Sequence, residues 1–504
     1  MRAAKNIPWL ILAIVALAAF LRFFNLGSES IWLDEAFSVH AAETSLASIV
    51  QKSISADVHP PLYNLLLHFW VLIFGQSEAA VRSLSACFGI ISVLLLYKVG
   101  RVLFDRQVGL IASILMAISA FSIAYSQETR AYCLLLLLTL ISFLILIKIL
   151  KADKPGKIHL FFYSLTNIVL CYTHIFGLFV VGAQVLYFLL FRRRYTKSQL
   201  TFWGAQAVTL VGFSPWVYVL VTKTFQDSIQ SLNWIPEPSF QIVARSLGSL
   251  SGAGYLWLPL GVLLMLVLLF LCLAGMFYSP KAQQQRASEV PQQSTKPMSL
   301  ATSLAEPRTA LLLIWFFFPL IISLILSFAI RPIFVSRYLI EITPALYLLA
   351  ARGIDNIDSS VASRTARKNA ATFTLIGLVC LISIPGLYNY YAHPHKAQWG
   401  EATNFIEQES RAGDIVVIYP DYDQLPFNYY RKGDTEITVM PFEVIENGEP
   451  ITSKERLWLV LSDYESTEAT SIKNDLFAHY GTDSLIMQKE LFHVAVYLFS
   501  IKGS

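Results

Sequence analysis

The sequence predicts a polytopic α-helical membrane protein with about eleven transmembrane helices and a C-terminal soluble α/β domain. Its 504 residues are 55% hydrophobic and only 14% charged, and the mean hydropathy is +0.55. These values are too apolar for a soluble multidomain protein. Apolar runs long enough to cross roughly 30 Å of hydrocarbon recur along the chain. The charge balance then changes sign after the last of them.

The apolar runs define the predicted membrane domain, residues 1–390. The first run is kept as a span because it is too long, and too poor in a small-residue cleavage site, for a signal peptide. The predicted spans lie near 8–26, 80–99, 108–125, 131–150, 158–174, 175–191, 200–221, 256–278, 309–329, 338–351 and 371–390.

The basic residues predict the orientation. With a cytoplasmic N-terminus, more than half of the 38 Lys and Arg fall in cytoplasmic loops, including the run Arg192-Arg193-Arg194. Lys and Arg concentrate on that side of membrane proteins. The first extracytoplasmic loop, about 27–79, and the C-terminal domain then lie outside a plasma membrane. The polar, Gln- and Pro-bearing loop at about 279–308 is expected to be a disordered cytoplasmic linker.

The region 391–504 differs in kind from the spans. From Lys396 onward it holds 9 basic and 18 acidic residues. A helical stretch at 399–410 is followed by strand-like runs at 414–419, 436–440, 457–461 and 494–499, separated by turn residues. This pattern predicts a small extracytoplasmic α/β lid or recognition domain, since it lacks a phosphate-binding loop and metal-ligand spacing.

Cysteine and histidine spacing predicts no metal site. The five Cys all fall in predicted spans without metal-ligand spacing. His174, near the outer end of the fifth span, is more readily an interhelical hydrogen-bonding residue than a ligand. The sequence does not identify a cofactor, and nucleic acid is not an expected partner.

Polar residues suited to chemistry gather in the outer loops. The first loop contains Asp34-Glu35 and then Asp57-Val58-His59-Pro60-Pro61. The next outer loop reads Ser126-Gln127-Glu128-Thr129-Arg130-Ala131-Tyr132, and the tenth span opens with Ser336-Arg337-Tyr338. A carboxylate near lipid is costly unless it faces a cavity or has a partner. These residues therefore indicate chemistry at a membrane surface.

Glycosyl transfer from a lipid-linked phosphosugar needs such a set. A carboxylate accepts the proton of the attacking hydroxyl, and cationic groups hold the phosphate and stabilise its charge as leaving group. Asp34 fits the first task, and Arg130, Arg337 and His59 fit the second.

These same motifs resemble the membrane-embedded GT-C glycosyltransferases, specifically the protein O-mannosyltransferase and aminoarabinose transferase superfamily, over roughly residues 8–390. The resemblance implies an outward-facing active site, a polyprenyl-phosphate sugar as donor and inversion at the anomeric carbon. It implies that Asp34 is the catalytic base with Glu35 beside it. It also implies that His59, Arg130, Arg337 and Tyr338 contact the donor phosphate or substrate. Supporting roles fall to Asp57, Glu128 and Tyr132.

Structural interpretations compete with each of these assignments. Asp34-Glu35 could cap a juxtamembrane helix starting near Ala36, and His59-Pro60-Pro61 could simply precede a helix. Arg130 could pair with Glu128, Arg337 could reach lipid headgroups, and Tyr132 could belong to an interfacial aromatic belt.

A transporter or lipid flippase is the competing function. Such a protein would place charges near the membrane midplane and break its helices with Gly or Pro, whereas the ionisable residues here crowd the outer rim. The enzyme interpretation, cell-envelope glycosylation, is therefore favoured. Membrane lipid and the lipid-linked donor are the expected partners, and the acceptor is a lipid, a polysaccharide or a protein.

Overall fold

The structure is a computed structural model that describes residues 8–55, 59–225, 234–277, 306–365, 369–433, 437–442 and 456–501. Its contacts divide the chain into two compact units. The helical unit contains Met1–Phe24, Leu46–Leu66 and Ser83–Tyr390. The second unit contains Asn25–Ser45, Leu67–Arg82 and Tyr391–Ser504, so it joins two pieces of the first loop region to the C-terminal region.

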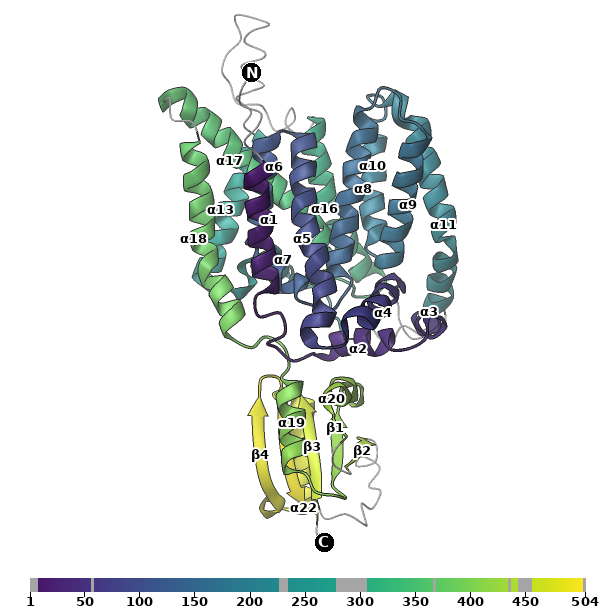
Figure 1. Cartoon of the computed structure of the whole chain (residues 1–504), viewed down its shortest axis with the longest axis vertical. Helices are drawn as coiled ribbons and strands as arrows, with labels where there is room; N and C mark the ends of the chain where they lie inside the picture. Colours follow the sequence, from purple (N-terminus) through teal and green to yellow (C-terminus); the bar gives the residue numbers. More distant parts are fainter. Residues whose placement is uncertain are drawn as a thin grey trace, which may run out of the picture. The chain divides into compact units, whose positions relative to one another are not determined.

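Every predicted span contains a helix (Figure 1). The helices of the spans are α1 (Pro8–Phe23), α5 (Glu78–Leu103), α6 (Arg106–Ala117) with α7 (Ala120–Ser126), α8 (Tyr132–Lys151), α9 (Lys157–Thr173), α10 (Gly177–Phe191), α11 (Gln199–Phe225), α13 (Leu258–Phe277), α16 (Pro307–Ala329), α17 (Thr343–Thr365) and α18 (Ala370–Ala392). Shorter helices between them are α3 (Leu46–Ser55), α4 (Leu62–Phe74) and α12 (Phe240–Leu250).

By length and composition, six helices of the described chain can cross a membrane, or seven if the bent pair α6 and α7 is one span. A multi-pass membrane protein is therefore confirmed, and the number eleven stays a prediction. The predicted linker at about 279–308 lies mostly outside the described residues, as does Asp57.

A buried arginine supports the bend of 64° between α6 and α7. Arg22, at the end of α1, is fully buried. It donates hydrogen bonds to the carbonyl oxygens of Met116 and Ala117 at 3.3 and 3.2 Å, and to Ser126 Oγ at 3.1 Å. The last carbonyls of a helix lack partners within it. Arg22 supplies those partners, so the break is built into the fold.

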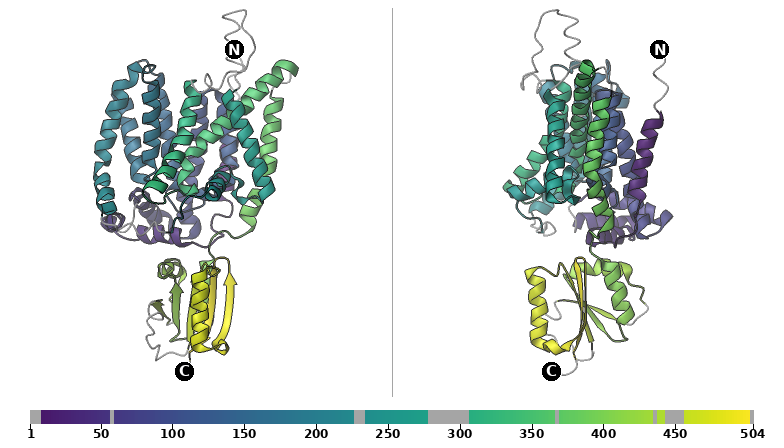
Figure 2. Two further views of the ribbon diagram at one scale, coloured as in Figure 1. Left: turned by 180° about the vertical axis from the view of Figure 1, so that it is seen from behind. Right: turned by 90° about the vertical axis from the view of Figure 1, so that its left-hand side faces the viewer.

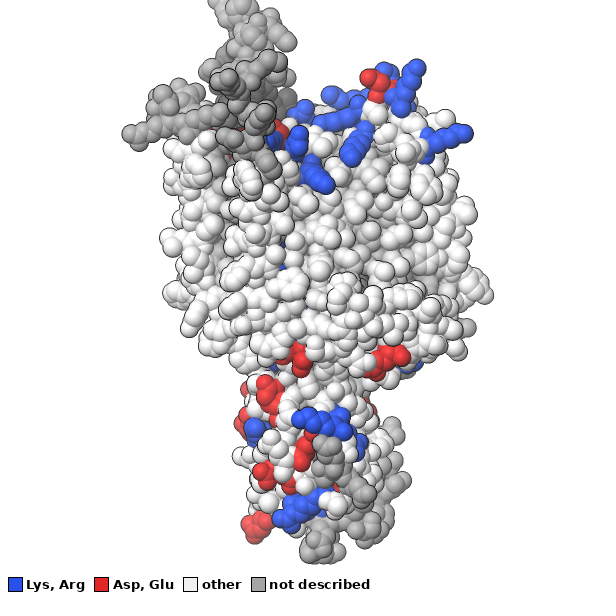
Figure 3. Space-filling view, viewed as in Figure 1, with Lys and Arg blue, Asp and Glu red and all other residues white. Residues whose placement is uncertain are grey.

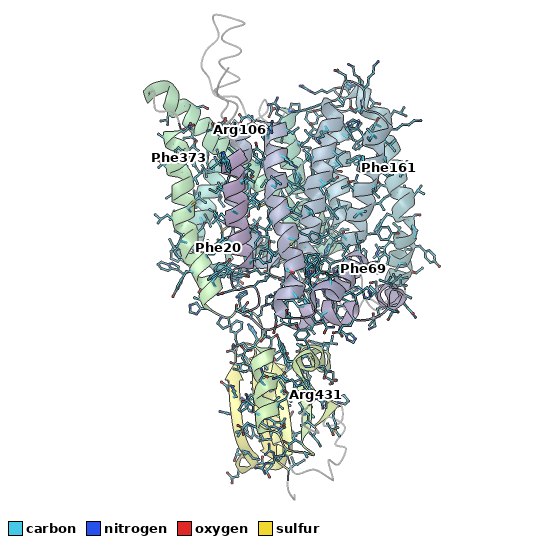
Figure 4. All side chains as sticks on the ribbon, viewed as in Figure 1. Phe20, Phe69, Arg106, Phe161, Phe373 and Arg431 are labelled. Carbon is cyan, nitrogen blue, oxygen red and sulfur yellow. The ribbon has the colours of Figure 1, made fainter. Side chains whose placement is uncertain are left out.

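The outer surface of the helical unit suits a bilayer. On the face shown in Figure 3, Lys and Arg gather at one end and the middle band is almost free of charge. Phe20, Phe161 and Phe373 lie on the surfaces of α1, α9 and α18 (Figure 4), and all three are exposed. Exposed aromatic side chains in an uncharged band are expected to contact lipid tails.

The second unit is built around a mixed five-stranded sheet of order β2-β1-β3-β5-β4. Its strands are β1 (Ile415–Tyr419), β2 (Thr438–Pro441), β3 (Arg456–Ser462), β4 (Leu485–Leu491) and β5 (Val494–Ser500). β2, β1 and β3 run parallel, whereas β5 is antiparallel to both β3 and β4. Its helices are α2 (Leu33–Ala42), α19 (Trp399–Glu409), α20 (Gln424–Tyr430) and α22 (Thr467–Tyr480).

Alternation along the strands gives this sheet two apolar faces. Trp458 and Val460 of β3 pack in one core with Trp399 and Ile406 of α19. The intervening Leu457, Leu459 and Leu461 pack in a second core with Leu476 of α22. The helices consequently cover both faces, as the right-hand view of Figure 2 shows. The predicted C-terminal α/β domain is confirmed, with α20, α22 and β4 as elements that the sequence analysis did not predict.

Candidate functional site

The acidic pair lies in the first turn of α2, after Trp32 as the N-cap residue. Neither carboxylate is the N-cap itself, but both occupy the first turn, where acidic residues interact favourably with the helix dipole. Successive helical residues point about 100° apart. Glu35 is accordingly fully buried, whereas Asp34 is only half-buried. Two adjacent carboxylates thus have different surroundings, and Asp34 is the more accessible.

Glu35 is the anion of a buried ion cluster. Its Oε1 accepts from Arg82 Nε at 2.8 Å, and its Oε2 accepts from Arg82 Nη2 at 2.7 Å. Lys396 Nζ lies 3.1 Å from the same Oε2. Buried charges are tolerated when they are paired and hydrogen-bonded. The cluster therefore holds the first turn of α2 in place.

The guanidinium of Arg82 is satisfied by the chain before α2. Its remaining N–H groups donate to the carbonyl oxygens of Leu26 at 3.1 Å, Glu29 at 2.8 Å and Ser30 at 2.9 Å. Every donor of Arg82 is used within the second unit. Sequence analysis did not single out Arg82 or Lys396, because their sequence distance from Glu35 gives no signal of contact.

The helical unit brings together predicted site residues in a cluster of rings. His59, Tyr132 and Tyr338 come from three separate segments. The ring centroids of His59 and Tyr338 are 5.9 Å apart, and those of Tyr132 and Tyr338 are 6.0 Å apart. We call this group, together with His174, the ring cluster. Tyr132 and Tyr338 are buried, so Tyr132 is not an exposed belt residue.

His174 also belongs to the ring cluster, although the sequence analysis assigned it to interhelical hydrogen bonding. Its ring centroid lies 4.8 Å from that of His59 and 5.0 Å from that of Tyr338. Phe176 N–H donates to His174 Nδ1 at 3.2 Å. The neutral imidazole then carries its proton on Nε2. The turn between α9 and α10 thus fixes a buried imidazole as a hydrogen-bond donor beside His59.

Arg337 places a cation next to the ring cluster. Its guanidinium carbon lies 5.7 Å from the Tyr338 ring centroid and 4.9 Å from that of Trp234. Aromatic faces attract cations, and an arginine held in this way can offer its planar donors to a phosphate. Arg337 is only partly buried, so a ligand can reach it.

The loop 126–132 fixes the other predicted residues. Gln127 donates to the carbonyl oxygens of Arg22 and Phe24 at 3.0 and 2.8 Å, and it accepts from Tyr390 Oη at 2.8 Å. Glu128 is buried, and Arg130 is partly buried, with its carbonyl oxygen accepting from Ser85 Oγ at 3.3 Å. The loop is thus anchored to α1 and α18.

The described residues contain no group of three or more His, Cys, Asp and Glu side chains that could hold a metal ion. The ring cluster contributes two imidazoles, those of His59 and His174.

Residues 58–219 match the family described as dolichyl-phosphate-mannose-protein mannosyltransferase. No curated protein matches the sequence. Among solved structures, apo ArnT from Cupriavidus metallidurans aligns with a TM-score of 0.59 and 13% identity over 97% of this chain and 98% of that one. The same protein bound to undecaprenyl phosphate gives a TM-score of 0.56 and 14% identity over 97% and 98%.

A second fold relative is the Archaeoglobus fulgidus oligosaccharyltransferase in complex with Zn and sulfate. It aligns with a TM-score of 0.57 and 11% identity over 92% of this chain and 69% of that one. At these identities the likeness speaks for the fold. Together with the family match, it confirms the resemblance to the GT-C superfamily.

Proposed function

With the GT-C fold as premise, we propose that the chain is an integral-membrane glycosyltransferase. It moves a sugar from a polyprenyl-phosphate donor to an acceptor hydroxyl on the extracytoplasmic face, with inversion. The observation that carries the proposal is the ring cluster: residues that the family resemblance assigns to the substrate meet in one unit although they are far apart in sequence. The binding of undecaprenyl phosphate by ArnT is a second support.

In the proposed reaction Asp34 accepts the proton of the acceptor hydroxyl as its oxygen attacks the anomeric carbon. The bond from that carbon to the phosphate oxygen breaks, and the electron pair leaves with the polyprenyl phosphate. Arg337 and the imidazoles of the ring cluster stabilise the charge that the phosphate gains. Direct displacement by the acceptor oxygen inverts the anomeric carbon.

Glu35 receives a different role in this proposal. Its oxygens already accept from Arg82 and form an ion pair with Lys396, so it orders α2 rather than taking a proton. Arg130, Glu128 and Asp57 keep their proposed places as substrate-side or supporting residues. About eleven spans, a cytoplasmic N-terminus and an extracytoplasmic C-terminal region belong to the same proposal.

The test is transfer by purified protein in lipid bilayers, with radiolabelled polyprenyl-phosphate sugars as donors and cell-envelope extract as acceptor. Asp34→Asn is expected to lower turnover by about 10² to 10⁴-fold, the usual contribution of a general base. Its donor affinity should stay near that of wild type, since the swap is nearly isosteric. Near-normal turnover in Asp34→Asn would remove Asp34 as base. Flux of donor across the bilayer without transfer would favour a flippase instead.

A further inference from the structure

The segment that carries Asp34 is held by the C-terminal region at successive points. Glu29 Oε1 accepts from the backbone N–H of His395 at 2.7 Å. Ser30 Oγ accepts from the backbone N–H of Gly400 at 3.0 Å and donates to Glu401 Oε2 at 2.6 Å. These contacts come immediately before α2, where a helix orientation is set.

Two more contacts continue the series toward α2. Ile31 N–H donates to Tyr430 Oη at 2.7 Å, and that hydroxyl donates to Glu78 Oε1 at 3.0 Å. A tyrosine hydroxyl is protonated at neutral pH, and it can therefore accept from one partner and donate to the other. Helix α20, which carries Tyr430, also packs on α2.

Lys396 differs from these contacts because it brings a positive charge to the buried cluster. It is 8% exposed, while Glu35 and Arg82 are 0% and 1% exposed. Arg82 belongs to α5, near the first loop in the sequence, whereas Lys396 lies three residues before the start of α19. The charge of Glu35 is therefore balanced by one cation from α5 and one cation from the C-terminal region.

We propose that Lys396 is a positioning residue for Asp34, through which the C-terminal region holds the proposed base in its working orientation. This inference rests on the proposed function. Lys396 acts on Glu35, Glu35 fixes the first turn of α2, and Asp34 is the preceding residue of that turn. Misplacement of a catalytic group by about 1 Å can lower a rate by about 10²-fold, so a contact behind the base has a measurable kinetic effect.

The experiment uses the full-length protein in lipid bilayers and the transfer assay above. Lys396→Met keeps most of the side-chain volume and removes the charge, and it is expected to lower kcat by about 10 to 10²-fold with a donor KM near that of wild type. Amide hydrogen exchange should become faster across residues 29–42. Lys432→Met, at an exposed lysine of the same region, is the matched control and should leave both readouts unchanged.

A double-mutant cycle tests the route of the effect. If Lys396 acts through Glu35, adding Lys396→Met to Glu35→Gln should change kcat by much less than it does alone. Additive effects, or an unchanged kcat in Lys396→Met, would overturn the inference. Should Lys396→Met fail to accumulate, Lys396→Gln takes its place with the same expectations.

The two proposals fail in distinguishable ways. If wild-type protein transfers no sugar, the proposed function fails before Lys396 is tested. If wild type is active, Asp34→Asn is inactive and Lys396→Met turns over normally, only the positioning role fails.

Discussion

The ion cluster of the second unit and the ring cluster of the helical unit hold their polar groups in different ways. In the ion cluster, Arg82 gives all its donors to the protein, and Glu35 is paired with two cations. In the ring cluster, rings from separate segments pack with centroids 4.8 to 6.2 Å apart. The first arrangement fixes a backbone segment, and the second brings buried rings of distant segments together beside Arg337. An ionisable residue in an outer loop is thus not by itself a catalytic one.

The largest expected effect comes from breaking the ion cluster. Glu35→Gln leaves Arg82 and Lys396 buried without their anion, and removing one partner of a buried pair costs about 3 to 5 kcal/mol. We expect the second unit to unfold at markedly lower denaturant, measured by limited proteolysis within residues 391–504. Glu43→Gln, at an exposed glutamate just after α2, is the control. Equal resistance of the two variants would show that the cluster is not a stabilising element.

Asp423 is another buried carboxyl of the same unit, and it offers a comparison with Glu35 and its two cations. Burial raises its pKa to about 6, although the hydrogen bond from Ser462 opposes the rise and the charge of Asp463 adds to it. The protonated form is thus favoured in the folded state. The contribution of Asp423 to the stability of the folded unit is complete below about pH 4 and is lost as the pH rises through about 6.

From that shift we expect the second unit to lose up to about 3 kcal/mol between pH 4 and pH 7 through this group. Asp423→Asn, which stays neutral, should remove that part of the pH dependence. The measurement is the unfolding midpoint across this pH range. Parallel curves for wild type and variant would mean that Asp423 titrates normally in the folded protein.

Substitution of Arg337 tests whether the cation next to the ring cluster binds the donor phosphate. Arg337→Ala should weaken donor binding by about 10 to 10²-fold, because a hydrogen bond to a charged group is worth about 1.5 to 3 kcal/mol. Binding of a radiolabelled polyprenyl-phosphate sugar measures this directly. Arg331→Ala, in the same stretch before α17, is the comparison. Equal affinities of the two variants would contradict a phosphate role for Arg337.

His174 offers the smallest effect and tests the ring cluster from within. His174→Phe keeps an aromatic ring but removes the Nε2 donor, and loss of one neutral hydrogen bond, about 1 kcal/mol, predicts donor binding weaker by about 5-fold. The same binding assay applies. Unchanged donor affinity with unchanged thermal stability would assign His174 to packing alone.

Much of the fold was predictable because its signals are local. Apolar runs predicted the long helices of the helical unit, and alternating residues predicted β1, β3 and β5. By contrast, β4 has the mixed sequence Leu-Ile-Met-Gln-Lys-Glu-Leu and pairs only with β5 in the sheet. An edge strand with polar residues gives a weak pattern. The same holds for α22, whose polar and apolar residues mix.

Sequence alone determined that this is a multi-pass membrane protein with an acidic C-terminal α/β region, since hydropathy and charge are read along the chain. It also singled out Asp34, His59, Arg337 and Tyr338 as candidates, through motifs within short stretches. Only the tertiary structure decided which neighbours these residues have. Glu35 meets Lys396, and His59 meets His174, across long separations in sequence. Such contacts depend on how the helices and loops pack, which no local pattern of residues records.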